Sequence, residues 1–216
     1  MGTNNIKLNL IDVGFTGDMN NQWKKELDKM GYILSFNPLY NSFNTTNHCH
    51  LRLAISDEEG ITDFNVLKKQ DCSSFFEVED TAASMRPQSP TDLDIKQVIK
   101  VNRIRLDTIL DSMEPHFNFL KVDTQGYDLK VIKSLGKYLN TIWCIQVEVF
   151  FAPFYKDAPL VDEVCKYIVT NGTFRFLGNA RKPNSSFGDF VFINEFAPRE
   201  FMDIVGRIYK CEALLA

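Results

Sequence analysis

The sequence lacks the features that mark membrane, secreted and nucleic-acid-binding proteins. Its 216 residues contain no apolar run near the ~20 residues of a membrane-spanning helix, and no signal-peptide core at the N-terminus. Five cysteines, an odd number without C-x-x-C spacing, predict neither a disulfide framework nor a zinc knuckle. A net charge of −4 argues against a basic surface for phosphates. We expect a cytoplasmic protein with no membrane span and no nucleic-acid partner.

Histidine is also scarce, with only three in the chain. His48, His50 and His116 have no known metal-ligand spacing, so no metal site is predicted. His48 is a minor candidate for a general base.

Length and hydrophobic content fit one globular domain. With 216 residues and 44% hydrophobic character, the chain can bury a sizeable core and form a ligand cleft. We therefore expect a single domain over residues 1–216, compatible with excision from a larger chain because the first apolar run begins almost at the N-terminus.

Apolar runs alternate with segments of helical spacing. Strands are expected at residues 6–13, 32–36, 51–55, 61–67, 101–104, 117–122, 141–150, 174–177 and 190–193. Helices are expected at residues 20–30, 106–113, 129–135 and 159–169. The stretch from Lys68 to about Ser89 has no sustained period and is interpreted as a mobile loop or lid. The alternation predicts a Rossmann-like α/β fold, with a mostly parallel sheet and helices on both faces.

A glycine-containing turn follows the first expected strand. Asp12, Gly14 and Gly17 resemble the dinucleotide fingerprint, except that Asp12 stands where its first glycine should be. A carboxylate there would repel a pyrophosphate but attract a cofactor with an ammonium and a sulfonium. The two glycines allow the backbone to approach a ligand closely. A βα turn with a helix-capping aspartate explains this segment equally well. About 20 residues further on, Asn37 stands where an acidic residue usually binds ribose hydroxyls, although an Asn-Pro turn is an alternative.

Charged residues close two otherwise apolar strands. Lys121 and Asp123 share a face with Phe119, so both should emerge at the carboxyl end of a central strand, where open α/β sheets bind ligands. Glu148 lies within another apolar strand, and a buried glutamate is rare unless it is paired. A structural salt bridge is the alternative reading, but this placement favours a site.

The order of the motifs resembles the FkbM family of methyltransferases. The matching segments are IDVGFTG (11–17), FNP (36–38), LAISDEEG (53–60), RLDTIL (105–110), KVDTQGYD (121–128), VEVFFAPFYKDAPL (147–160) and DFVF (189–192). The resemblance implies a class I methyltransferase fold with a seven-stranded sheet and an antiparallel closing strand, and S-adenosylmethionine as the cofactor. The family usually has glutamate in place of Asn37, and often in place of Gln125.

The resemblance also implies roles for particular residues. Cofactor-binding residues would be Asp12, Gly14, Phe15 and Gly17 along the methionine part, Asn37 at the ribose, and Ser56 and Asp57 beside the adenine. From the chemistry of the residues themselves, we expect Asp123 as the catalytic base, Glu148 as its partner or alternative, and Lys121 as an electrostatic neighbour. Substrate contacts would be Gln125, Tyr127 and Tyr155. A divalent cation held by the carboxylates is compatible with the sequence but is not predicted.

The expected activity is O-methylation of a sugar hydroxyl, with a deoxyhexose of a glycan as the preferred acceptor. The resemblance suggests fusion to, or action beside, glycosyltransferases. Two alternatives stay open. One is a non-catalytic Rossmann-like module that binds a glycan or a partner, favoured by Asn37 and Gln125. The other is an NAD-dependent oxidoreductase, which Asp12 and the missing acidic ribose residue disfavour.

Overall fold

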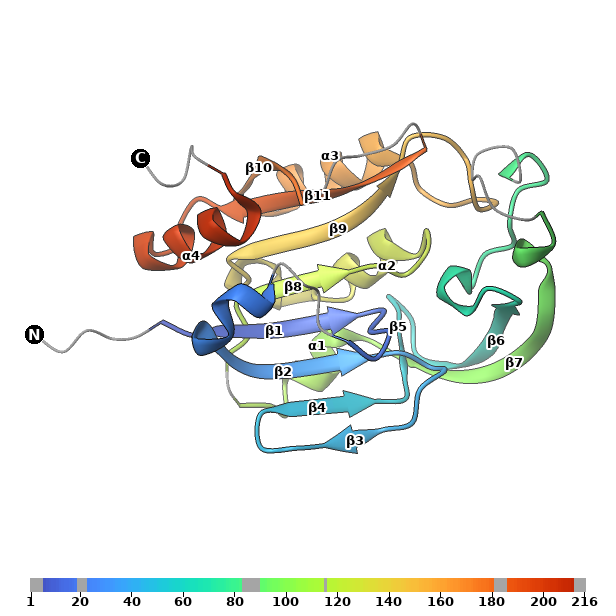
Figure 1. Ribbon diagram of the computed structural model, residues 1–216, viewed down its shortest axis with the longest axis horizontal. Helices are drawn as coiled ribbons and strands as arrows, with labels where there is room; N and C mark the ends of the chain where they lie inside the picture. The colour runs from blue at the N-terminus through green and yellow to red at the C-terminus, as the bar shows by residue number, and fades with distance from the viewer. Residues whose placement is uncertain (1–5, 19–22, 83–89, 115, 181–185, 212–216) are drawn as a thin grey trace, which may run out of the picture.

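The computed structural model describes residues 6–18, 23–82, 90–114, 116–180 and 186–211, which form two sheets and the helices around them (Figure 1). In spatial order, the large sheet consists of β10 (Phe174–Asn179), β11 (Phe187–Asn194), β9 (Cys144–Phe150), β8 (Phe119–Val122), β1 (Leu8–Val13), β2 (Met30–Phe36), β4 (His48–Leu51) and β3 (Phe43–Asn44). The small sheet consists of β5 (Ala54–Ile55), β7 (Ile95–Ile104) and β6 (Gly60–Leu67).

The large sheet is mixed but mostly parallel at its centre. β4, β2, β1, β8 and β9 run parallel, β11 runs antiparallel to β9 and to β10, and β3 runs antiparallel to β4. The expected parallel sheet with an antiparallel closing strand is therefore present. The expected number of seven strands is wrong, because the two-residue β3 adds an eighth at the edge. A strand this short has no periodicity that the sequence could display.

Helices cover both faces of the large sheet. The α-helices are α1 (Leu106–Leu110), α2 (Asp128–Lys133), α3 (Val161–Asn171) and α4 (Arg199–Tyr209). The short 3₁₀ helices are η1 (Trp23–Lys29), η2 (Gln70–Cys72), η4 (Pro90–Leu93) and η5 (Gly136–Thr141). No helix in the described part of the chain is long and apolar enough to span a bilayer.

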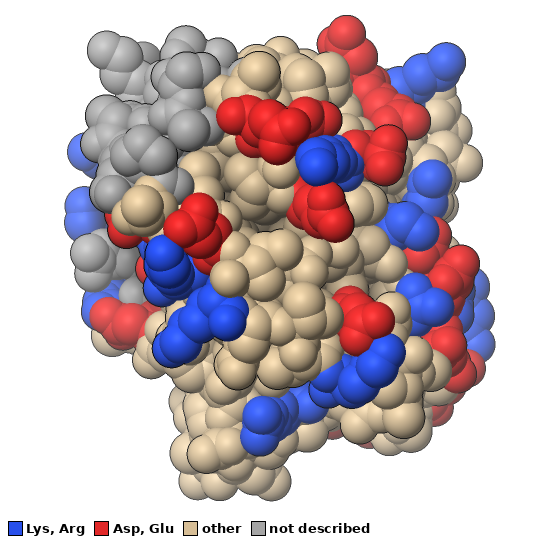
Figure 2. All heavy atoms as spheres, turned by 90° about the vertical axis from the view of Figure 1, so that its right-hand side faces the viewer, with Lys and Arg blue, Asp and Glu red and all other residues tan. Residues whose placement is uncertain are grey.

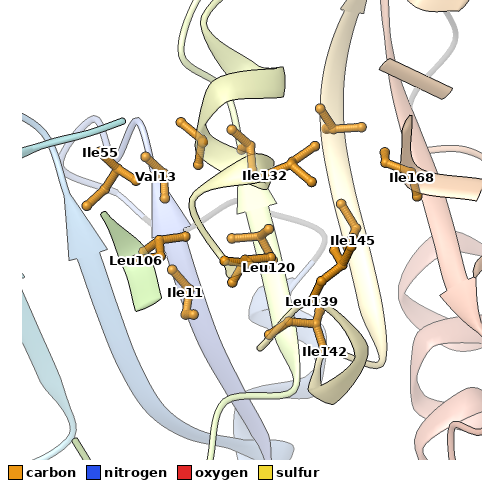
Figure 3. Packing of buried hydrophobic residues seen from close by; sticks show 14 of the residues in the cluster. Ile11, Val13, Ile55, Leu106, Leu120, Ile132, Leu139, Ile142, Ile145 and Ile168 are labelled. Carbon is orange, nitrogen blue, oxygen red and sulfur yellow. The ribbon is translucent and has the colours of Figure 1, made fainter. Parts of the chain in front are cut away.

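The main core lies on one face of the large sheet. Ile11 of β1, Leu120 of β8 and Ile145 of β9 are fully buried there and point toward side chains of the covering helices, such as Leu106 and Ile132 (Figure 3). Because alternate residues of a strand point to opposite faces, Leu10, Asp12, Phe119 and Lys121 belong to the other face. On that face, apolar residues pack against η1 and α4 and form a second core. Toward the carboxyl ends of the strands, the residues on the same face are polar.

Two expected strands are different in extent. The run 51–55 is divided between β4 and β5, which belong to different sheets, because the Leu53 amide turns back to the Leu51 carbonyl at 2.8 Å and ends β4. The run 101–104 is only the end of the ten-residue β7. Most of the earlier residues of β7 are exposed, and Lys96, Gln97 and Lys100 interrupt its apolar residues, so the sequence shows no continuous apolar run there.

The predicted helix at residues 20–30 is also different. Residues 20–22 lie outside the described part of the chain, η1 is a 3₁₀ helix, and Met30 already belongs to β2. Gly31, the residue after the predicted helix, lies inside β2. A Cβ there would collide with the side-chain oxygen of Asn9, which accepts a hydrogen bond from the Tyr32 amide at 2.9 Å. This glycine therefore serves a close approach between strands.

The C-terminal helix α4 was not expected, although its pattern is clear in retrospect. Phe201, Ile204, Val205 and Ile208 are buried, at the spacing of one helical face, against the second core. The expectation of a mobile loop or lid at 68–89 is wrong for its described part, which is tethered at several points, as shown below. Residues 83–89 lie outside the described part of the chain.

Candidate active site

A row of polar side chains crosses one face of the large sheet near the carboxyl ends of its strands. Asp12 of β1 lies beside Ser35 of β2 and Lys121 of β8, and Lys121 lies beside Gln146 of β9. All four residues are buried. Burying a polar group costs free energy unless it is paired, so each of these residues needs a partner. Polar residues in place of apolar core residues are typical of a functional site.

The row is centred on an ammonium shared by two carboxylates. Lys121 Nζ lies 3.1 Å from Asp12 Oδ1 and 3.7 Å from Asp123 Oδ2. Burial by itself lowers the pKa of Lys121, but the charges of Asp12 and Asp123 outweigh it, so its pKa is raised and it stays charged. Burial raises the pKa of Asp12, and the Lys121 ammonium offsets part of that rise. The Asp12 carboxylate, expected to attract a cofactor ammonium, is thus already paired within the protein.

Gln125 connects the other acidic residues of the site. Its side-chain nitrogen donates to Asp123 Oδ1 at 2.9 Å and to Glu148 Oε2 at 2.7 Å. Its side-chain oxygen lies 2.8 Å from the Tyr155 hydroxyl, which is also 2.9 Å from the Cys72 carbonyl. Gln125 and Tyr155, both expected to contact substrate, are therefore engaged with protein groups.

The turn after β8 is shaped by Asp128, the first residue of α2. Its carboxylate accepts hydrogen bonds from the backbone amides of Thr124 and Gly126, both at 3.0 Å. Burial raises the pKa of Asp128 to about 7, against the opposing effect of these amides. The turn needs this support because Gln125 and Gly126 both have positive φ, of 57° and 91°.

Gly14 brings the loop after β1 against the end of β8. Its φ is +95°, and a Cβ there would collide with the backbone carbonyl oxygen of Asp123. Gly17 also has a positive φ, of +98°, but a Cβ there would meet nothing within 4 Å. The first glycine is required by packing and conformation, whereas the second is required by conformation alone.

Asn37 links the ends of β1 and β2. Its side-chain nitrogen donates to the Phe15 carbonyl, and its side-chain oxygen accepts from the Leu39 amide, both at 2.9 Å. The second bond makes the Asn-Pro turn considered from the sequence. A carboxylate at this position could accept from Leu39 but could not donate to Phe15, which gives asparagine a structural reason here.

Ser56 and Asp57 join the site to the region around α2. Ser56 Oγ lies 3.1 Å from the Tyr127 hydroxyl. The Asp57 carboxylate accepts from Lys130 Nζ at 3.2 Å, and its backbone carbonyl accepts from Arg105 at 2.7 Å. These contacts fix the end of β5, whose Ala54 and Ile55 face the cavity described next.

A cavity of about 370 Å³ opens at the carboxyl ends of β1, β2 and β8, a volume within the range of small-ligand sites. Six of the predicted site residues line it: Gly14, Asn37, Asp123, Gln125, Tyr127 and Glu148. Seven others are not among its described lining residues: Asp12, Phe15, Gly17, Ser56, Asp57, Lys121 and Tyr155. Of the second group, Lys121, Phe15, Ser56 and Tyr155 contact residues of the first directly.

One wall of the cavity comes from residues 69–75, and no motif or periodicity in the sequence predicts this position. Ser74 Oγ donates to the Gln125 carbonyl at 2.7 Å, and Ser73 Oγ accepts from the Leu67 amide at 3.1 Å. Together with the contact of Tyr155 with the Cys72 carbonyl, these bonds hold the wall against the loops that follow β8 and β9. It is a fixed wall, and its hydroxyls, not its periodicity, were the available signal.

His48 belongs to a separate cluster. Its Nε2 and the Nδ1 of His50 each lie 2.8 Å from Ser35 Oγ, and the ring of Phe15 packs edge-on against His48 at 5.2 Å. Burial lowers the pKa of both histidines, which keeps them neutral at pH 7. His48 is not among the described lining residues of the cavity, so the base candidates there are carboxylates.

The sequence model of the methyltransferase FkbM domain matches residues 11–176. The chain belongs to the FkbM methyltransferase family. Comparison with curated proteins and with solved structures gives no match. The matched range begins in β1 and ends in β10, so it contains all described lining residues of the cavity except Phe187 of β11. The family makes this chain a methyltransferase domain and implies S-adenosylmethionine as its methyl donor.

The charges around the cavity of this FkbM domain suit such a donor. The described lining residues include the carboxylates of Asp71, Asp123 and Glu148 against a single ammonium, that of Lys69. Figure 2, which looks onto the carboxyl ends of the strands, shows acidic and basic side chains interspersed around a centre of uncharged residues. A cationic ligand fits this arrangement better than a pyrophosphate does.

Two further observations concern the acidic residues of the domain. Asp189 of β11 is buried and lies directly opposite Glu148 of β9, a placement that its position in the DFVF segment did not predict. Among the described residues, no group of three or more His, Cys, Asp or Glu side chains has an arrangement that could hold a metal ion.

Proposed function

We propose that this domain is an S-adenosylmethionine-dependent O-methyltransferase that acts on a sugar hydroxyl, with a deoxyhexose of a glycan as the preferred acceptor. The observation that carries the proposal is the cavity itself, where the base candidates Asp123 and Glu148 face the space beside the glycine loop after β1.

The cofactor half of the cavity would lie between β1 and β5. Gly14 lines this half, and Phe36, Leu53 and Ile55 offer apolar walls for an adenine ring. Asn37 stands at the position for the ribose, where the second lone pair of its oxygen is available beyond the Leu39 amide. The cofactor supplies a methyl group on a positively charged sulfur.

Asp123 would act as the general base. Its side chain is 28% exposed at the cavity, whereas that of Asp12 on the other side of Lys121 is 6% exposed. The Asp123 carboxylate would accept the proton of the acceptor hydroxyl as its oxygen takes the methyl group that the cofactor would supply. Lys121 balances part of the negative charge around the base.

Aromatic side chains favour a sugar as the acceptor. Phe64, Phe75, Tyr127 and Phe187 line the cavity, and Phe75 and Tyr127 contact each other with ring centroids 4.5 Å apart. Aromatic rings bury large apolar surfaces and can cover the C–H face of a pyranose. A deoxyhexose presents such a face together with hydroxyls for the base.

Isothermal titration with S-adenosylmethionine, S-adenosylhomocysteine and NAD tests the cofactor. We expect binding of the first two and none of NAD, with a rise in melting temperature on adding S-adenosylhomocysteine. Binding of NAD alone would support an oxidoreductase, and the absence of all three would support a non-catalytic module.

The Asp123→Asn variant tests the base. The substitution keeps the size of the side chain but removes the proton acceptor, so turnover should fall roughly 10²–10⁴-fold with nearly unchanged cofactor affinity. Glu148→Gln should be damaging too. Asp162→Asn, a change on the exposed side of α3, is the matched control and should leave turnover unchanged. Loss of cofactor binding in Asp123→Asn would move this residue to the cofactor site.

Mass spectrometry of products identifies the acceptor. Glycans with and without terminal deoxyhexoses, and hydroxylated lipids and polyketides, are incubated with the protein and S-adenosylmethionine. A mass gain of one methyl group on deoxyhexose glycans alone supports the proposal. Inactivation by EDTA with rescue by Mg²⁺ or Mn²⁺ would replace the base by metal activation of the hydroxyl.

A further inference from the structure

Both the nitrogen and the oxygen of the Gln125 side-chain amide form hydrogen bonds with protein groups. Its nitrogen has two hydrogens, and two carboxylate oxygens lie within 2.9 Å of it, one from Asp123 and one from Glu148. Ionised carboxylates only accept hydrogen bonds, so the amide nitrogen and not its oxygen must face them. The amide oxygen consequently faces the Tyr155 hydroxyl, 2.8 Å away.

The backbone of Gln125 is fixed as firmly as its side chain. Its φ is +57°, a conformation that is uncommon for a residue with a Cβ. The Ser74 hydroxyl donates to its carbonyl at 2.7 Å, and the residue is 8% exposed. The chain therefore maintains a disfavoured conformation that aims one amide at two carboxylates, which is the kind of arrangement found at functional sites.

The surroundings make these two hydrogen bonds necessary. Asp12 lies on the far side of Lys121, Asp189 lies opposite Glu148, and Asp128 lies in the turn beside Asp123. Lys121 Nζ is 3.7 Å from Asp123 Oδ2 and is shared with Asp12. Among these described neighbours, Asp12 and Asp189 add negative charge near the pair, Asp128 adds more above about pH 7, and the Lys121 ammonium opposes them. Two carboxylates in contact with the same atom would share a proton unless donors stabilise both charges.

We propose that Gln125 is a positioning residue whose amide holds the carboxylates of Asp123 and Glu148 side by side in ionised form. This inference rests on the function proposed above. It explains how Asp123 keeps an unprotonated oxygen, which a base needs, while a second carboxylate stays close. Gln125 acts through these carboxylates and does not itself bind the acceptor. A glutamate at this position would supply no donor and one more negative charge.

The test follows the side-chain carboxyl carbon signals of Asp123 and Glu148 by NMR from about pH 4 to about pH 9 in the absence of cofactor. Asp123→Asn and Glu148→Gln assign the signals. In Gln125→Met, which removes both donors at similar length, the pair should take up its first proton about one pH unit higher than in the unsubstituted protein. Gln125→Glu should shift it further, and it also serves if Gln125→Met does not fold.

Gln146→Met is the matched control. Gln146 is a buried glutamine two residues before Glu148 on β9, and its side-chain oxygen accepts from the Tyr209 hydroxyl at 2.7 Å. Its replacement removes an amide of the same size from the same face of the sheet, so proton uptake by the pair should stay close to that of the unsubstituted protein. An equal shift in this control would overturn the inference, because it would reflect general loss of packing.

Methyl transfer gives a second readout. With an acceptor found in the glycan assay, the acid limb of the pH profile of kcat should move upward in Gln125→Met by the same interval as the NMR titration, while KM for S-adenosylmethionine changes little. Unchanged titration overturns the inference whatever the activity. A shifted titration in a protein that transfers no methyl group supports the pairing role of Gln125 and overturns the proposed function instead.

Discussion

The buried pair of Lys121 and Asp12 gives a prediction that does not depend on the function. Lys121→Met keeps the aliphatic stem but removes the charge, which leaves the buried Asp12 carboxylate without its partner at 3.1 Å. Removing one member of a buried ion pair costs about 3–5 kcal/mol of folding free energy. Asp12→Asn should cost less, about 1–3 kcal/mol, because Lys121 keeps Asp123 at 3.7 Å as a second partner.

The double variant makes the prediction specific. In the double variant, Asp12→Asn removes the buried carboxylate that Lys121→Met alone would leave unpaired. Adding Asp12→Asn to Lys121→Met should therefore restore about 1 kcal/mol or more, although Asp12→Asn is destabilising by itself. This reversal of sign requires that the two side chains interact directly.

Urea unfolding at pH 7, followed by the fluorescence of Trp23 and Trp143, measures these differences, provided that the m-value is unchanged. Lys137→Met, which breaks the exposed contact of Lys137 with Asp111, is the control and should change stability little. The reasoning is wrong if Lys121→Met behaves like this control, or if the two single effects simply add in the double variant.

Four further variants test the loops around the cavity. Gly14→Ala should lower stability and abolish S-adenosylhomocysteine binding in calorimetry, because the new Cβ has no room. Gly17→Ala should cost only about 1–2 kcal/mol of stability, for the left-handed backbone, and should keep measurable binding. Asp128 holds its proton up to about pH 7 in the folded protein but releases it near pH 3.8 in the unfolded chain. The free energy of unfolding should therefore fall as pH rises between these values, by at most about 1.4 kcal/mol per pH unit. Asp128→Asn should flatten this pH dependence, as measured by urea unfolding. Asn37→Glu should tighten S-adenosylhomocysteine binding through a charged ribose contact while it lowers the melting temperature by loss of the bond to Phe15, and weaker binding would show that the pocket is built around the amide.

Strand ends were the most predictable part of this protein. The central strands are buried on both faces, so they appear as continuous apolar runs, and the polar residue that follows each run lies at the carboxyl edge of the sheet. Asp123 could be placed at the cavity in this way, as could Gly14 and Asn37. The order of these motifs, which no single motif supplies, led to the correct family.

Other parts could not be predicted because their signal is not local. The wall at 69–75 owes its place to hydroxyl and carbonyl contacts with Gln125 and Tyr155, which are far away in the sequence. The exposed half of β7 has no apolar alternation, and β3 is too short to have any. By contrast, α4 has an ordinary helical pattern, so its omission reflects an incomplete reading of the sequence and not a limit of it.

The same distinction decides which carboxylate can act as the base. From the sequence, Asp12 and Asp123 are equivalent, since each is an acidic residue at the end of a central strand. In the fold they lie on either side of Lys121, and the difference between them comes from the glycine loop and from Gln125. The carbonyl of Asp123 contacts Gly14 and its carboxylate accepts from Gln125, which together turn its side chain toward the cavity. The Asp12 side chain is 6% exposed and that of Asp123 is 28% exposed, so the Asp123 carboxylate is the more accessible of the two from the cavity. Asp12 is left to keep Lys121 charged, and its substitution should therefore affect the stability of the fold before it affects binding of the cofactor.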